Sequence, residues 1–168
     1  SLVYMPWQNN ITAMVYRKDL FEEKGIQVPK TWDEFLEAAK ALTEDLDGDG
    51  KMDRYGCVFA GTRNDSAESR FQTFALTYGC DFVTENGDGT FTSGFGTDAY
   101  RNAMTSFIDL AANKGVTPPG LIETGYSEAY TMIAADQACM FFSASNVLGG
   151  IYNANPEMRG KMGSFRMP

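Results

Sequence analysis

Histidine is missing altogether from the 168 residues of this chain. It is the side chain best suited to proton transfer near neutral pH, so Ser-His-Asp and Cys-His catalysis and histidine-ligated zinc are excluded. Catalysis by carboxylates alone stays open. The missing histidine therefore makes a binding function a better expectation than an enzymatic one.

Basic residues are also scarce, with 14 Lys and Arg against 22 Asp and Glu, giving a formal net charge of −8 and a pI near 4.5. Phosphate recognition needs clustered Lys and Arg, so we expect no nucleic-acid partner and no membrane-surface role. No apolar run approaches the roughly 18 residues that span a bilayer. The first ten residues, "SLVYMPWQNN", have neither the basic start nor the long apolar stretch of a signal peptide.

Cysteine is limited to Cys57, Cys80 and Cys139, so at least one thiol must stay unpaired. Cys57 and Cys139 lie in the apolar runs "YGCVF" and "ACMFF", where a free thiol usually serves as a small core residue. Disulfides are therefore not expected to hold this fold together. This does not exclude a location outside the cytoplasm.

Hydrophobic residues, in contrast, are plentiful at 43%, and the length suits one domain. The patterns predict strands over 11–16, 55–60 and 137–144, an extended segment over 162–168, and tight turns between short strands within 85–94. They predict helices over 17–26, 31–45, 67–79, 97–115, 126–136 and 146–153. Such a mixture predicts an α/β fold.

The clearest local signal is the start of the second helix. Thr31 is its predicted N-cap, and Glu34 three residues later completes a capping box. An apolar face follows at helical spacing, formed by Trp32, Phe35, Leu36, Ala39 and Leu42. We expect this helix to end near Asp45, where an acidic loop begins.

The acidic loop "DLDGDGKMDRYG" matches most of an EF-hand calcium loop. Positions 1, 3, 5, 6 and 9 of such a loop are occupied here by Asp45, Asp47, Asp49, Gly50 and Asp53. Position 7 is Lys51, which would contribute its backbone carbonyl. At position 12, however, Gly56 replaces the bidentate glutamate. A structural Ca²⁺ is predicted, and a calcium-free Asp/Gly turn is the alternative.

Three stretches in this order resemble a known family. They are "YMPWQNNITAMVYRKDLFEEKGIQVPKTWDEFLEAAKALT" (4–43), the acidic loop (45–56) and "EAYTMIAADQACMFFSASNVLGGI" (128–151). The chain resembles the second lobe of an extracellular solute-binding protein of family 1, the sugar-binding group that feeds ABC importers. One departure is that Asn146 stands near the position where that family commonly has a tryptophan.

The resemblance implies the fold and the setting of the chain. It implies one lobe of a periplasmic-binding-protein-like type II fold, with helices packed around a small mixed sheet. Residues 1–168 would be a single lobe excised from a two-lobe protein, with both ends at hinge strands. The protein would bind a carbohydrate, in particular an oligosaccharide, in the cleft between the two lobes and pass it to ABC permease subunits. We expect no catalysis, no direct membrane insertion, and an extracytoplasmic location as a cell-surface lipoprotein or periplasmic protein whose signal segment lies outside this chain.

Candidate ligand-binding residues follow from strand ends and from the sugar's need for aromatic faces and planar polar groups. They are Trp7, Asn9 and Asn10 near the first hinge, Arg63, Asn64 and Asp65 after the strand 55–60, Tyr126 at a helix start, and Ser143 and Asn146 after the strand 137–144. Packing of Trp7 at the hinge is an open alternative. So is capping of the next helix by Asp65, Ser66 or Ser145.

Two other functions stay open from the sequence. A glycan-processing enzyme would need a carboxylate pair, for which Asp65 and Glu68 are candidates. A calcium-dependent interaction module of dockerin type would need a second loop like 45–56, and the sequence has none.

Overall fold

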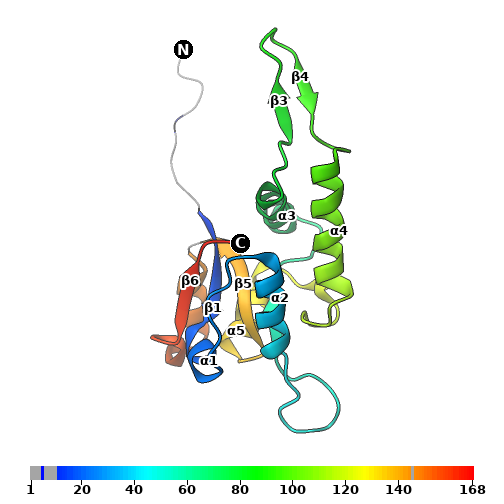
Figure 1. The fold of residues 1–168 in the computed structure, drawn as a ribbon. Helices are drawn as coiled ribbons and strands as arrows, with labels where there is room; N and C mark the ends of the chain where they lie inside the picture. Colours follow the sequence, from blue (N-terminus) through cyan, green and yellow to red (C-terminus); the bar gives the residue numbers. More distant parts are fainter. Residues whose placement is uncertain (1–4, 6–10, 145) are drawn as a thin grey trace.

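The computed structural model describes residue 5, residues 11–144 and residues 146–168. Its centre is a four-stranded sheet in the order β2-β5-β1-β6 (Figure 1). β1 is antiparallel to both neighbours and β2 is parallel to β5, so the sheet is mixed, as predicted. The strands are β1 (Thr12–Arg17), β2 (Tyr55–Val58), β5 (Ala138–Ala144) and β6 (Met162–Phe165).

The strand register defines two edges of this sheet. Thr12 lies opposite Ala144, and Met14 lies opposite Phe165. The start of β1 and the last residues of β2, β5 and β6 therefore share one edge, which we call the carboxyl edge. The other edge, where Arg17 faces Met162, is called the opposite edge.

Helices surround this sheet at positions close to those predicted. They are α1 (Lys18–Glu23), α2 (Trp32–Ala41), α3 (Asp65–Thr77), α4 (Asp98–Ala112), α5 (Tyr126–Ala134) and α6 (Val147–Ala154), with two 3₁₀ turns, η1 (Leu121–Glu123) and η2 (Pro156–Met158). A short hairpin of β3 (Val83–Glu85) and β4 (Phe91–Ser93) extends beyond α3 and α4, away from the central sheet (Figure 1). The predicted turn chemistry within 85–94 is confirmed.

The capped start of α2 is confirmed in detail, whereas its predicted end is wrong. The hydroxyl of Thr31 accepts a hydrogen bond from the Glu34 amide at 3.2 Å, and the Glu34 carboxylate accepts one from the Lys30 amide at 2.7 Å. α2 ends at Ala41 instead of near Asp45. The chain turns there because the Thr43 hydroxyl donates a hydrogen bond back to the Ala39 carbonyl. Glu44, the next residue, already forms a β-bridge with Arg54, across the acidic loop.

β5 forms the middle of the core. Met140, Phe141 and Phe142 are fully buried, and the Phe142 ring lies 4.6 Å from that of Phe59. All three cysteines are free and buried, which confirms the prediction of core thiols for Cys57 and Cys139. Burial raises the pKa of the Cys139 thiol to about 12, so this thiol stays protonated at neutral pH.

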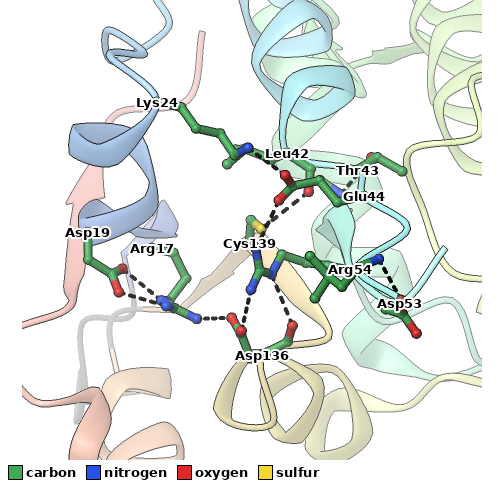
Figure 2. Close-up of polar contacts among 12 residues, drawn as sticks. Arg17, Asp19, Lys24, Leu42, Thr43, Glu44, Asp53, Arg54, Asp136 and Cys139 are labelled. Atoms are coloured by element: carbon green, nitrogen blue, oxygen red, sulfur yellow. Dashed lines mark hydrogen bonds and ion pairs between the residues drawn. The ribbon is translucent and has the colours of Figure 1, made fainter. Parts of the chain in front are cut away.

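An ion-pair network joins three segments at the opposite edge (Figure 2). Arg17 and Arg54 are only 5% and 9% exposed, and both pair with the carboxylate of Asp136. Arg17 also binds Asp19 at 2.6 Å, and Arg54 binds Glu44 at 2.9 Å. Each buried guanidinium therefore has two carboxylate partners, which offsets the cost of removing its charge from water.

Candidate functional site

Loops from separate parts of the chain converge at the carboxyl edge. The carbonyl of Thr124 accepts hydrogen bonds from the amides of Gly61 and Thr62, at 2.9 and 3.3 Å. This ties the loop after β2 to the segment before α5. A side-chain carbon on Gly61 would overlap the Leu121 carbonyl, so glycine is what permits this approach. The two loops are therefore held in fixed positions relative to each other.

Tyr126 and Asn146 meet at this edge. Tyr126 is the first residue of α5, and its hydroxyl donates a hydrogen bond to Oδ1 of Asn146 at 3.2 Å. Its ring lies 5.9 Å from that of Phe141 on β5. Ser143, near the end of β5, is fully buried, and its hydroxyl has no partner among the residues that the structure describes. Three of the predicted candidates thus lie around the end of one strand.

Arg70 belongs to the same place, although the sequence-based reasoning missed it. It lies on α3, is 6% exposed, and places its guanidinium carbon 5.7 Å from the centre of the Tyr126 ring. Its Nη1 donates to the Ser69 hydroxyl at 2.8 Å, while its Nε has no partner in the described part of the chain. A signal was present, because Arg70 precedes the buried Phe74 by four residues and so shares its helix face.

Burial lowers the pKa of Arg70, and the nearby Tyr126 acts in the other direction. An arginine stays protonated through such a shift, because its ordinary pKa is above 12. The site therefore contains a buried positive charge.

α3 also reaches the start of β1. The hydroxyls of Thr73 and Thr12 lie 3.5 Å apart, and an open groove of about 730 Å³ runs beside them toward Phe165 at the end of β6. The carboxyl edge is thus hollowed between α3 and the end of β6, and Arg70 and Tyr126 are not among the residues that line this groove.

Asn64, a predicted ligand-binding residue in the loop before α3, has a structural role. The side chain of Asn64 caps α3, accepting from the amides of Ser66 at 3.0 Å and Ala67 at 3.4 Å. The predicted capping of α3 by Asp65 or Ser66 is therefore wrong, because Asn64 stands at the N-cap position. Arg63 and Asp65 are exposed, and ligand binding by these three residues stays a prediction. Trp7, Asn9, Asn10 and Ser145 lie outside the described residues.

The acidic loop lies at the other end of the molecule. Glu44 and Arg54 form a bridge that closes its base, and Arg54 is bound to Asp136 just before β5. Figure 1 shows the loop projecting from the lower end, away from the carboxyl edge. Any metal bound there would be remote from Tyr126.

Three carboxylates in this loop are arranged as a cation site would need. Asp45, Asp47 and Asp49 each offer an oxygen within 4.8 Å of the others. Hydrogen bonds from the Gly50 amide, and then from that of Gly48, hold the pKa of Asp45 below its usual range. Oxygen donors of this kind suit Ca²⁺. Lys51 is exposed, and Asp53 instead accepts from the Leu46 amide at 2.7 Å.

The remaining EF-hand ligand cannot come from position 12. Gly56 is buried against α2, and a side-chain carbon there would overlap the carbonyl oxygen of Ala39. The Glu44 carboxylate is already bound to Lys24 and Arg54, at 2.5 and 2.9 Å. The residues fit a calcium ion in part, with waters or backbone oxygens left to complete the shell.

Comparisons with known proteins identify the family and the fold of this chain. Residues 1–166 match the family described as bacterial extracellular solute-binding protein. The polygalacturonan/rhamnogalacturonan-binding protein YtcQ of Bacillus subtilis is 37% identical over 102 residues, covering 60% of this chain and 20% of that protein. The match over nearly the whole chain shows that it belongs to the bacterial extracellular solute-binding protein family.

Solved structures show the same fold with sugars bound. A solute-binding protein of an ABC transporter from Thermotoga lettingae, with α-D-tagatose, has a TM-score of 0.81 and 26% identity over 95% of this chain and 39% of its own. Maltose-bound MalE3 of T. maritima has a TM-score of 0.79 and 25% identity, over 97% and 39%. The chain therefore spans well under half the length of the relatives it matches. It has the periplasmic-binding-protein type of fold, and none of the described helices is long and apolar enough to cross a membrane.

Proposed function

We propose that this chain forms one lobe of a two-lobe binding protein, which holds a carbohydrate between its lobes for an ABC importer. The observation that carries this proposal is the cluster of Tyr126, Asn146 and Arg70 at the carboxyl edge. β1 begins and β6 ends at this same edge as neighbouring strands. Chain segments that cross to a second lobe would therefore flank the cluster.

The chemistry of the cluster suits a sugar. A pyranose offers an apolar face and a ring of hydroxyl groups, which proteins meet with aromatic rings and with amide or guanidinium groups. Tyr126 is half-buried and Asn146 is exposed, so both have surface left for a ligand. YtcQ and the two solved structures are named for, or contain, carbohydrates. Closure of the second lobe over the sugar would signal occupancy to the permease subunits.

The location and partners follow from the same proposal. An importer of this kind takes its cargo from outside the cytoplasm, so we place the protein there, as a cell-surface lipoprotein or a periplasmic protein. Its partners would be the sugar and the ABC permease subunits. The described helices provide no membrane span of their own.

The setting of the candidate catalytic carboxylates favours binding without catalysis. Asp65 and Glu68, the candidate catalytic pair, are both exposed on the first turn of α3, and Glu68 accepts a hydrogen bond from Gln72 at 2.8 Å. A general acid for glycoside cleavage normally needs a buried, apolar setting that keeps it protonated. This surface pair has no such setting.

Calorimetry of the full-length gene product tests the binding site. We expect Tyr126→Ala to weaken oligosaccharide binding at least about tenfold, equivalent to 1.4 kcal/mol, because the ring and its bond to Asn146 are both lost. Tyr152→Phe, a conservative change on α6, is the control and should leave the affinity unchanged. The isolated 168-residue chain should bind far more weakly, since it provides half of the contacts. Micromolar binding by the isolated chain, or unchanged affinity of the Tyr126 variant, would contradict the proposal.

We also propose a structural Ca²⁺ in the acidic loop, supported by the convergence of Asp45, Asp47 and Asp49. Without a cation, their mutual repulsion loosens the loop. Calcium should raise the melting temperature by about 2–4 °C for each kcal/mol of binding free energy, and Asp47→Ala with Asp49→Ala should abolish the rise. Glu85→Ala with Asp88→Ala changes the net charge equally on the hairpin and should preserve it. An unmodified chain whose melting temperature ignores calcium would show that the loop is not a calcium site.

A further inference from the structure

We propose that Arg70 binds an anionic group of the ligand, so that the cargo is an acidic sugar such as a uronic-acid oligosaccharide. This inference rests on the proposed function and specifies its substrate class. It starts from a contrast among the buried arginines of the described residues, which are Arg17, Arg54 and Arg70.

Arg17 and Arg54 each have two carboxylate partners within the fold. Arg70 is as buried as they are, yet no carboxylate of the described residues lies within ion-pair distance of it. A buried charge is costly unless it is paired, and folded proteins rarely leave one without a partner. The missing partner of Arg70 is an anion supplied from outside the described chain.

The donor atoms of Arg70 suit a carboxylate. Its Nη1 is bound only to the neutral hydroxyl of Ser69, and its Nε has no partner in the described part of the fold. Nε and a terminal nitrogen form the edge of a guanidinium that can donate two parallel hydrogen bonds to one carboxylate. The Tyr126 ring lies 5.7 Å from the guanidinium carbon, within the range of a cation–π contact.

A second unpaired group lies at the same strand end. The Ser143 hydroxyl is fully buried and has no hydrogen-bond partner within residues 11–144 and 146–168. Buried polar atoms are nearly always satisfied in native structures. Ser143 on β5 is thus a second buried polar side chain, besides Arg70 on α3, that a polar ligand at this edge could satisfy.

The overall negative charge of the chain means that an acidic sugar can be preferred only through a local positive charge. The formal net charge of −8 repels anions at long range. Any preference for an acidic sugar must therefore come from direct contact with a local cation. Among the predicted site residues Arg63 is exposed, whereas Arg70 is desolvated and so interacts more strongly with a bound anion.

Calorimetry with matched ligands tests the inference on the full-length gene product. The probes are trigalacturonate and its fully methyl-esterified form, which have the same rings and differ in charge. We expect the acid to bind at least about tenfold more tightly than the ester, and Arg70→Gln to bring the two affinities within about threefold. A hexose phosphate compared with the free hexose distinguishes a phosphate from a carboxylate as the preferred anion, and preference for either anionic form supports the role of Arg70.

Arg159→Gln is the matched control. Arg159 is exposed and stacks 5.0 Å from the Tyr152 ring, just before β6 on the opposite edge. This variant should keep the full preference for the acid. Arg70→Lys keeps the charge and should keep part of it, which also provides a test if Arg70→Gln fails to fold.

The outcomes separate this inference from the proposed function. Equal affinity of the unmodified protein for acid and ester, or an undiminished preference in a folded Arg70→Gln variant, overturns the role of Arg70 while sugar binding stands. Absence of binding to these probes and to neutral oligosaccharides such as maltotriose overturns the proposed function as well.

Discussion

Replacing Gly56 with alanine is expected to destabilise the chain by about 3 kcal/mol or more, the upper end of the usual cost of overpacking. Gly56 packs so closely against α2 that a side-chain carbon at this position would overlap the Ala39 carbonyl oxygen. That neighbour is backbone of a helix and cannot rotate away as a flexible side chain could. The Gly56 amide also donates to the Thr43 hydroxyl at 3.0 Å, so a shift of β2 would break this bond too.

Urea denaturation of the purified chain measures this effect. Gly149→Ala is the matched control, because Gly149 lies within α6, is exposed, and has nothing near its added carbon. Helix propensity predicts that this control stabilises the chain by up to about 1 kcal/mol. A Gly56→Ala variant with a free energy of unfolding within about 1 kcal/mol of the parent would contradict the packing described here.

The same contact governs the acidic loop. Gly56→Glu would complete the EF-hand pattern at position 12, and sequence reasoning alone would expect tighter calcium binding. The structure predicts the reverse, since a glutamate cannot be placed against Ala39. The variant should unfold at lower urea concentration than the parent, with or without calcium.

Asp136→Ala is expected to cost about 2–4 kcal/mol, because it leaves Arg17 and Arg54 buried with one carboxylate fewer each. The estimate is below the full cost of breaking a buried ion pair, since the Asp136 side chain is 40% exposed. Figure 2 shows both guanidinium groups directed at this one carboxylate. Asp136 thus connects β1, the base of the acidic loop and the start of β5.

Two further variants separate charge from backbone effects at this position. Asp136 has a φ of 63°, a left-handed conformation that asparagine and glycine tolerate better than alanine does. Asp136→Asn keeps this tolerance and one acceptor oxygen, but its amide nitrogen cannot accept the bond from the second arginine. Asp136→Gly keeps only the tolerance. Urea midpoints should rank the parent above Asn, and Asn above Gly and Ala. Equal stability of the parent and the Gly variant would show that the ion pairs contribute nothing.

Much of the fold could be predicted because local signals agreed with one another. The capping box at Thr31, the apolar strand 137–144 and the glycines that end helices, such as Gly79 with a φ of 76°, each correspond to an observed feature. The end of α2 was misplaced because the bridge between Glu44 and Arg54 starts earlier than the helical pattern stops. Such pairings across a loop leave no periodic trace in a sequence.

The candidate site was only partly visible in the sequence. Tyr126 could be chosen because it stands at the predicted start of a helix, and Asn146 because it follows the predicted strand 137–144. Arg70 was missed although its spacing from Phe74 places it on the buried face of α3, because a lone arginine on a helix usually faces solvent. Its contact with Tyr126, far along the chain, leaves no trace in the sequence. For the α3 cap, Asn64, Asp65 and Ser66 are all suitable residue types, and only the backbone geometry selects Asn64.

Hydrogen exchange of the full-length gene product, with and without a saturating oligosaccharide, tests most directly whether cargo binds at the carboxyl edge. We predict slower exchange in peptides covering residues 61–70, 124–130 and 146–154, with no change in the acidic loop over residues 45–53. Protection confined to the acidic loop or to the hairpin of β3 and β4, under conditions where calorimetry shows binding, would contradict this placement.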